Sequence, residues 1–243
     1  MFIFYTSLST SMFRNFWKKT VGHDINHAIS RKEFIENSHR RLSTINSEFG
    51  HAFKFLKNYP HSVSFFGSSR FAEDHPCYIH ARALSRRIVE ELKYAVVTGG
   101  GQGVMEAANR GAFEAGGKSV GMNIVLPHEQ KMNQYLTAHM RFYYFFVRKV
   151  ALTFSAEVFI FFPGGFGTLD EFFELVTLVQ SGKIARVPII CVGREYWQKI
   201  LDLAIILRDD YKTISSGDEK IFHITDSDDE VMKIIRNTPA RRE

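Results

Sequence analysis

From residue 62 onward, short apolar runs alternate along the chain with longer stretches of mixed polarity. Continuous apolar runs of roughly four to eight residues are typical of strands that are buried on both faces, and strands separated by helices indicate a parallel sheet. The sequence therefore predicts an α/β fold with a doubly wound parallel sheet. The expected strands cover residues 63–66, 94–98, 119–125, 141–145, 157–162, 187–192 and 222–225.

The segments between these strands have the spacing of helices. Their apolar residues recur three or four positions apart, which places them on one helical face. We expect helices over 104–115, 168–181, 196–207 and 226–236, one helix that ends near residue 92, and one that begins at Arg148-Lys149.

A further helix is expected upstream of the sheet, over 30–57. It begins at Ser30-Arg31-Lys32-Glu33, a capping box in which the Ser and Glu side chains satisfy free backbone donors reciprocally. Apolar residues follow at helical spacing, so one face packs against another part of the protein. We therefore divide the chain into a partly helical N-terminal extension, 1–60, and a Rossmann-like domain, 61–243.

Composition narrows the class of ligand. The chain has 243 residues, of which 45% are hydrophobic, so a sizeable core is possible; its net charge of +5 and pI near 9.1 favour anionic ligands. It contains no run of roughly five or six like charges and no nucleic-acid-binding motif. We expect a phosphorylated small molecule as the ligand, and no nucleic acid.

Cysteines and apolar segments indicate a cytoplasmic protein. Cys77 and Cys191 give neither a disulfide framework nor a metal-binding spacing, and the histidines form no convincing metal set. In the apolar stretch 1–13 the cations follow the apolar run, whereas a signal peptide places them before it. No apolar run approaches the roughly 18 residues that span a bilayer. We expect no membrane association and no metal.

Three glycine turns follow the ends of predicted strands, at Gly67, at 99–101 and at 164–167. The carboxyl ends of parallel strands lie at one edge of the sheet, where ligands bind, so these turns should converge. The strongest is Pro163-Gly164-Gly165-Phe166-Gly167-Thr168, which joins a strand to a helix. Glycine lets a ligand approach the backbone, and the helix start offers free N–H donors, so this loop predicts a phosphate site. The Thr168 hydroxyl can cap the helix or donate to a phosphate oxygen.

Two other segments depart from known nucleotide fingerprints. Gly99-Gly100-Gly101-Gln102-Gly103 lacks the third glycine of the dinucleotide motif, and the next strand does not end in the acid that binds a ribose. The segment 112–119 begins with Ala112 and lies between helix and strand, which is the reverse of a P-loop. A hydride-transfer enzyme and a P-loop nucleotidase are therefore disfavoured.

Charged residues accompany the predicted phosphate loop. Arg148-Lys149 lies at the predicted rim of the sheet, and Glu171 lies four residues after Gly167. Cation pairs on helices are usually solvated, and acids in a first helical turn usually stabilise the helix dipole. An acid beside an anion site is nevertheless repelled by the anion, so its presence there indicates a function.

The glycine turns and charges together resemble a known family. Gly67-Ser68-Ser69, Gly99 to Met105, Arg148-Lys149 and the segment 163–171 are similar in order and spacing to the LONELY GUY family, cytokinin riboside 5′-monophosphate phosphoribohydrolases formerly labelled lysine decarboxylases. The resemblance covers about 63–225, and the segments 121–124 and 126–130 resemble those of bacterial members.

The resemblance implies hydrolysis of the N-glycosidic bond of AMP or a related purine monophosphate, giving free base and ribose 5-phosphate. It implies no metal, no organic cofactor, and a homodimer or a higher even oligomer. The implied catalytic pair is Arg148 and Glu171. The implied substrate-binding residues are Gly67, Ser68, Gly100, Gly101, Met105, Asn123, Glu129, Lys149, Gly164, Gly165, Phe166, Gly167, Thr168, Leu169, Asp170 and Thr177.

The chemistry of the reaction agrees with these roles. Breaking a glycosidic bond develops positive charge on the ribose, which a carboxylate such as Glu171 stabilises, and the same group can orient water. Arg148 can hold the nucleotide and favour departure of the base. Phe146-Val147 stands where plant members carry polar residues, and the N-terminal extension is absent from the minimal plant form. The preferred base is therefore open between adenine, a modified adenine and another base.

Two rival functions follow from the same residues. A decarboxylase that uses pyridoxal phosphate needs a Schiff-base lysine, and no lysine here has a recognisable context for one. A non-catalytic carrier of a nucleotide or of the molybdenum cofactor remains an alternative. Carriers share the glycine rim but need not keep Arg148 and Glu171, so this pair discriminates between the two functions.

Overall fold

The computed structural model describes residues 30–125 and 131–239, and the chain divides into two compact units, 1–44 and 45–243. Helix α2 (Arg31–Leu56) begins in the first unit, and its last part belongs to the second. The predicted capping box is confirmed, because Ser30 N donates to Glu33 Oε2 at 2.9 Å and Glu33 N donates to Ser30 Oγ at 3.2 Å. The domain boundary after residue 60 stays a prediction.

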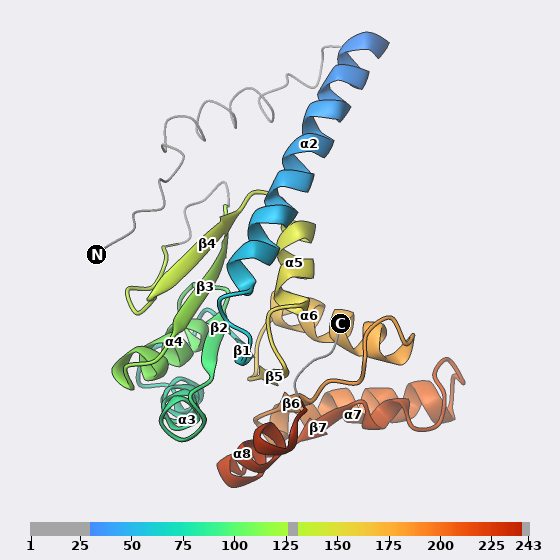
Figure 1. Cartoon of the computed structure of the whole chain (residues 1–243). Coiled ribbons are helices and arrows are strands. Elements are labelled where there is room, and N and C mark those ends of the chain that lie inside the picture. Colours follow the sequence, from blue (N-terminus) through green and yellow to red (C-terminus); the bar gives the residue numbers. More distant parts are fainter. Residues whose placement is uncertain (1–29, 126–130, 240–243) are drawn as a thin grey trace. The chain divides into compact units, whose positions relative to one another are not determined.

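The described strands of the second unit form one parallel sheet, in the order β4-β3-β2-β1-β5-β6-β7 (Figure 1). Every neighbouring pair is parallel, which confirms the predicted fold class. The strands are β1 (Ser62–Phe66), β2 (Ala95–Thr98), β3 (Ser119–Ile124), β4 (Ala138–Phe142), β5 (Val158–Phe161), β6 (Ile189–Cys191) and β7 (Phe222–Ile224).

Helices cover both faces of this sheet. One face packs against α3 (Pro76–Leu92), α4 (Val104–Glu114) and α8 (Asp228–Asn237). The other face packs against the end of α2 and against α5 (Phe145–Thr153), α6 (Phe166–Gln180) and α7 (Arg194–Asp209). A 3₁₀ turn, η1 (Asp218–Lys220), precedes β7. The central strands are buried on both sides, which explains their continuous apolar sequence.

The strand order reverses between β1 and β5. The chain winds outward from β1 to β4 and then returns to β5 on the other side of β1. Two backbone hydrogen bonds join the carboxyl ends here: Phe162 N donates to Phe66 O at 2.8 Å, and Ser68 N donates to Pro163 O at 3.0 Å. Such a reversal opens a crevice beyond the strand ends, where ligands of this fold class bind.

Aromatic packing attaches α6 to the sheet. The buried ring of Phe172 lies 4.9 Å from that of Trp197, 5.1 Å from that of Phe222 and 5.5 Å from that of Phe161, measured between ring centroids. Edge-on contacts of this kind add to the stabilisation from burial. Glu171, the residue before Phe172, is buried as well.

The fourth strand, predicted over 141–145, is present, but it lies earlier, at Ala138–Phe142. β4 ends at Phe142, Tyr144 is the N-cap of α5, and the helix begins at Phe145. The apolar run 142–147 has the composition of a strand. In the structure only Val147 of the first helical turn is buried, and Phe145 and Phe146 are exposed, so the run follows helical rather than strand periodicity.

The helix after the phosphate loop begins earlier than predicted. Gly165 is the N-cap of α6 and Phe166 its first residue, so Thr168 lies within the first turn and does not open the helix. Glu171 consequently lies in the second turn.

Close packing of α3 on α4 gives a test of the fold. A Cβ on Gly111 would lie 2.1 Å from Arg82 O, whereas one on Gly50, in α2, would meet nothing within 4 Å. We expect Gly111→Ala to lower the free energy of unfolding by about 1–3 kcal/mol, as overpacking does, and Gly50→Ala to raise it by up to about 1 kcal/mol through helix propensity. Urea unfolding measures both, and equal effects would contradict the packing.

Candidate functional site

Arg148 extends from α5 over the carboxyl ends of β2 and β3. Its Nε donates to Met122 O at 2.7 Å, and a Cβ on Gly99 would lie 2.5 Å from its Nη2. Only 12% of the side chain is exposed. Burial lowers the pKa of Arg148, and the charge of Glu171 acts in the opposite direction. An arginine keeps its proton at neutral pH even so, so it supplies a fixed cation at this edge.

Glu171 faces Arg148 from α6. Its Oε1 lies 4.0 Å from Arg148 Nη1, and 10% of its side chain is exposed. Burial raises the pKa of Glu171 to about 7; Arg148 and Lys149 lower it, and Glu174 and Asp170 raise it further. A buried carboxyl that exchanges a proton near neutral pH, beside a fixed cation, is a common arrangement for acid–base or electrostatic catalysis.

The loop after β2 is held by a buried polar network. Thr98 Oγ1 donates to Asn109 Oδ1 at 2.6 Å and accepts from Gly100 N at 2.8 Å. Asn133 Nδ2 donates to Asn109 Oδ1 and to Gly101 O, each at 2.9 Å. Sequence reasoning missed Asn109 and Asn133, and the only signal for Asn109 is an amide on the buried face of α4.

Asn123 lies against Gly100 at the end of β3. Gly100 has φ +70°, and a Cβ there would lie 2.5 Å from Asn123 Oδ1, so this position requires glycine on two grounds. Asn123 is buried, and its Oδ1 has no hydrogen-bond partner among the described residues. An unpaired buried acceptor is costly, so this oxygen departs from the usual pairing of buried polar groups.

The loops after β1 and β2 are locked together. Val104 N donates to Ser68 O at 3.0 Å, and Gly103, with φ +66°, leaves no room for a Cβ, which would lie 2.2 Å from the same oxygen. Met105 reaches back so that its Sδ would lie 2.8 Å from a Cβ on Gly99. The predicted residues Gly67, Ser68, Gly100, Gly101 and Met105 therefore belong to one connected rim.

The glycine loop after β5 presents an open helix start. Tyr196 Oη donates to Gly164 O at 2.8 Å, and a Cβ on Gly164 would lie 2.2 Å from Thr168 Oγ1. The N-cap, Gly165, forms no side-chain cap, and a Cβ on Gly165 or Gly167 would meet nothing within 4 Å. The start of α6 thus has no side-chain cap from its N-cap residue, and its first-turn N–H groups have no partner within the helix, as an anion site requires.

The remaining predicted residues lie on α6, and Lys149 reaches that helix from α5. Lys149 Nζ contacts Asp170 at 3.0 Å and Glu174 at 3.3 Å. A groove of about 730 Å³ follows α6, and neither Arg148 nor Glu171 lines it. Its lining residues are Lys149, Phe166, Leu169, Asp170, Phe173, Glu174, Thr177 and Leu178. Predicted Glu129 lies outside the described residues.

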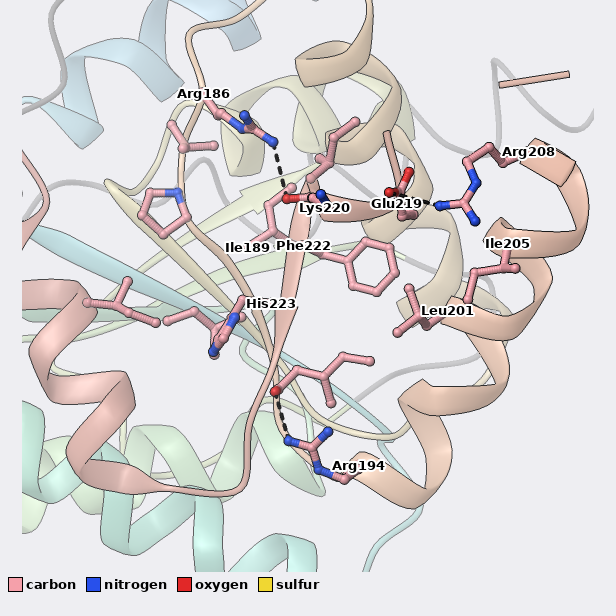
Figure 2. A pocket seen from close by; sticks show the side chains of 16 residues that line it. Arg186, Ile189, Arg194, Leu201, Ile205, Arg208, Glu219, Lys220, Phe222 and His223 are labelled. Carbon is pink, nitrogen blue, oxygen red and sulfur yellow. Dashed lines mark hydrogen bonds and ion pairs between the residues drawn. The ribbon is translucent and has the colours of Figure 1, made fainter. Parts of the chain in front are cut away.

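A second groove, of about 720 Å³, lies at the β7 edge of the sheet, and Figure 2 shows it from close by. It contains none of the predicted site residues. Its arginines serve the fold: Arg186 donates to Lys220 O at 3.1 Å, Arg194 donates to Ile224 O at 3.2 Å, and Arg208 lies 3.0 Å from Glu219. The chemistry therefore gathers at the glycine rim rather than here.

Two classes of feature are missing from the part of the chain that the structure describes. Within 30–125 and 131–239, no group of three or more His, Cys, Asp or Glu side chains could hold a metal ion. Of the helices in these ranges, none combines the length and apolarity needed to cross a membrane.

Comparison with known families agrees with the site. A family model described as a possible lysine decarboxylase matches residues 105–235, which include Arg148 and Glu171. The chain belongs to this family. The match confirms the resemblance to the LONELY GUY family, whose members carried the decarboxylase label. No curated protein matches the chain.

Solved structures of similar proteins confirm the fold of this family member. The protein TM1055 is 26% identical over 72% of this chain and 98% of its own, with a TM-score of 0.54. The molybdenum cofactor binding protein of Rippkaea orientalis is 21% identical over 72% of this chain and 93% of its own, with a TM-score of 0.51. The molybdenum cofactor carrier protein of Chlamydomonas reinhardtii is 20% identical over 73% and 97%, with a TM-score of 0.52.

The raised pKa of Glu171 predicts a pH-dependent stability. The unfolded carboxyl ionises near pH 4.5, but the folded one keeps its proton up to about pH 7. Stability that is fully present below pH 4.5 is therefore lost as the pH rises through 7, by up to about 3 kcal/mol. The side chain of the variant Glu171→Gln cannot ionise, so the variant should not lose this stability. Its free energy of unfolding relative to that of the wild type, measured with urea, should therefore increase between pH 4 and pH 8.

The exposed Glu195 of α7 offers a matched control. The difference in free energy of unfolding between Glu195→Gln and the wild type should stay nearly constant over the same pH range. If the stability of Glu171→Gln relative to the wild type does not increase with pH, the Glu171 carboxyl ionises at its ordinary pKa.

Proposed function

We propose that the protein hydrolyses the N-glycosidic bond of a nucleoside 5′-monophosphate, AMP or a related purine nucleotide, to free base and ribose 5-phosphate. One observation carries the proposal: the buried Glu171 carboxyl, with a pKa of about 7, lies 4.0 Å from Arg148 at the edge where the glycine loops meet. The roles below follow from that geometry.

The start of α6 would hold the 5′-phosphate. Its first-turn N–H groups are not capped by the N-cap residue, and the helix dipole favours an anion there. Thr168 Oγ1, in the same turn, can add a donor. A phosphate fixed at this point would direct the rest of the nucleotide along the rim, because the loops after β1 and β2 continue the same edge. Binding energy at the phosphate would then orient the sugar for reaction.

Glu171 would act at the bond that breaks. As the bond between C1′ and the base nitrogen lengthens, positive charge develops on the ribose, and the carboxylate stabilises it. The same carboxylate can take a proton from the attacking water, since its pKa of about 7 suits a base at neutral pH. Water supplies the new C1′–O bond, and the departing base receives the proton.

Arg148 would stabilise the departing base. Its guanidinium is fixed by the bond to Met122 O and cannot lose its charge at neutral pH. A positive charge beside the base favours the electron density that the base gains on leaving. Asn123, with its unpaired Oδ1 at the end of β3, offers an acceptor for a hydroxyl or amino donor of the same ligand.

The decarboxylase description does not fit these residues. A Schiff-base lysine must react as a neutral amine. Lys149, the lysine of the predicted site, is partly desolvated, but its ion pairs with Asp170 and Glu174 raise its pKa overall and hold it as a cation.

A carrier function is the second candidate. Two of the similar structures are described as molybdenum cofactor binding or carrier proteins. The glycine rim and the open start of α6 would serve such a phosphorylated ligand equally well. The two functions differ in turnover, so one experiment separates them.

Incubation with AMP tests the proposed activity. The purified protein should release adenine and ribose 5-phosphate, measured by chromatography. Glu171→Gln should lower kcat by at least about a hundredfold, because a neutral amide cannot stabilise the cationic transition state. Binding of AMP, measured by calorimetry, should persist in this variant.

The control for that experiment is Glu195→Gln, which should keep wild-type turnover. Tight binding of a phosphorylated ligand without turnover of any purine or pyrimidine monophosphate would instead support the carrier. Full activity in Glu171→Gln would remove Glu171 from the mechanism.

The pH profile gives an independent test of the role of Glu171. If the carboxylate is the active form, kcat at saturating AMP should rise with pH and level off above about 7, the pKa that burial gives this group. Saturation matters because the phosphate of free AMP also titrates, near pH 6. A kcat that does not change between about pH 5.5 and 8.5 would contradict the assignment.

A further inference from the structure

The start of helix α5 is not capped by the side chain of its N-cap residue, Tyr144, and its first turn contains no acidic residue. The start of a helix carries free N–H groups and a partial positive charge, which an acceptor with negative charge satisfies best. This helix carries Arg148, so whatever holds its start bears on the proposed site.

The missing acceptor comes from α2. Glu48 Oε1 accepts from Tyr143 N at 2.6 Å, and Glu48 Oε2 accepts from Tyr144 N at 3.1 Å. The carboxylate thus uses both oxygens on two consecutive amides, that of the N-cap residue of α5 and that of the residue before it. Burial raises the pKa of Glu48, and the two backbone bonds oppose that rise. Charge-assisted bonds in a partly desolvated place are stronger and more directional than surface ones.

Apolar contacts join the same two helices. The rings of Phe49 and Phe146 lie 6.4 Å apart, and those of Phe53 and Phe154 lie 5.9 Å apart. Phe146 is in the first turn of α5 and Phe154 is its C-cap, so α2 contacts both ends of the helix. Ala52, between the two rings on α2, is fully buried in the core.

One helical turn connects this contact to Arg148. Arg148 N donates to Tyr144 O at 3.1 Å, so the residue that Glu48 holds is the first hydrogen-bond partner of Arg148. The Arg148 side chain then has to meet Met122 O at 2.7 Å and Glu171 at 4.0 Å. Distances this specific tolerate little movement at the helix start.

We infer that Glu48 is a positioning residue: it holds the start of α5 and thereby sets the place of Arg148 against Glu171. The end of the N-terminal helix is then part of the machinery of the site. The catalytic consequence rests on the proposed function, whereas the control of Arg148 by Glu48 can be measured without any reaction.

Glu48→Gln tests the inference because it keeps the shape of the side chain but loses the charge and one of the two acceptors. Hydrogen exchange at the amides 144–149 should become faster, and the Arg148 Nε–H resonance, assigned with Arg148→Lys, should shift. The value of kcat for AMP should fall about tenfold, with KM changed less than about twofold, because the phosphate contacts of α6 are untouched. Glu48→Asp, which keeps the charge at a shorter reach, should restore part of kcat.

Glu36→Gln is the matched control, since Glu36 is an exposed residue of the same helix. It should change none of these quantities. Exchange in α3 and α4, on the opposite face of the sheet, should stay at the wild-type level in Glu48→Gln and so distinguish a local effect from unfolding. If Glu48→Gln does not fold, Glu48→Asp alone decides, by exchange and by the Nε–H resonance.

Two outcomes would overturn the inference. The first is an unchanged α5 exchange and Nε–H resonance in Glu48→Gln. The second is a loosened α5 with wild-type kcat in an active enzyme, which would show that Glu48 holds the helix without positioning Arg148. If the wild type turns over no nucleotide, the proposed function fails, and the exchange and resonance data still decide whether Glu48 places Arg148.

Discussion

Parallel pairing of β1 with β5 brings together segments that are far apart along the chain. The register joins Val63 to Val158 and Phe66 to Phe161, so the two strands end level with each other. The next strands follow the same direction on either side, and every loop that leaves a carboxyl end emerges at one edge. Without this pairing the phosphate loop would have no neighbour at the ends of β1 and β2. The order and direction of the strands thus bring the loops of the site together, and the side chains act within that arrangement.

The same edge of the sheet holds buried charged and polar groups that cost stability, as well as groups that can bind a ligand. A buried carboxyl and a buried guanidinium at 4.0 Å each lose hydration, and their attraction offsets only part of that loss. Asn123 Oδ1, which has no hydrogen-bond partner within the described part of the chain, adds a further cost. Stable folds tolerate such groups where a ligand completes them, and the aromatic core around Phe172 supplies rigid support close by.

The features that could be predicted from the sequence are those formed by residues close together along the chain. The glycine turns, the strand and helix alternation, and the positions of Arg148 and Glu171 each leave a signal within a few residues. The start of α5 did not, because an apolar run such as 142–147 suits a strand and a helix alike. The bonds from Glu48 to Tyr143, and from Asn133 to Asn109, join residues that are distant in sequence. No spacing rule registers a contact that only the folded chain creates.

The absence of a side chain at Gly99 has a consequence for how this site can change. The space that a Cβ would need there is already taken by the Arg148 guanidinium and by Met105 Sδ. A side chain at position 99 would have to displace the ends of Arg148 and Met105, so the place of the Arg148 guanidinium depends on a residue that carries no side chain itself. Any redesign of the rim for a new ligand has to treat positions 99, 105 and 148 together.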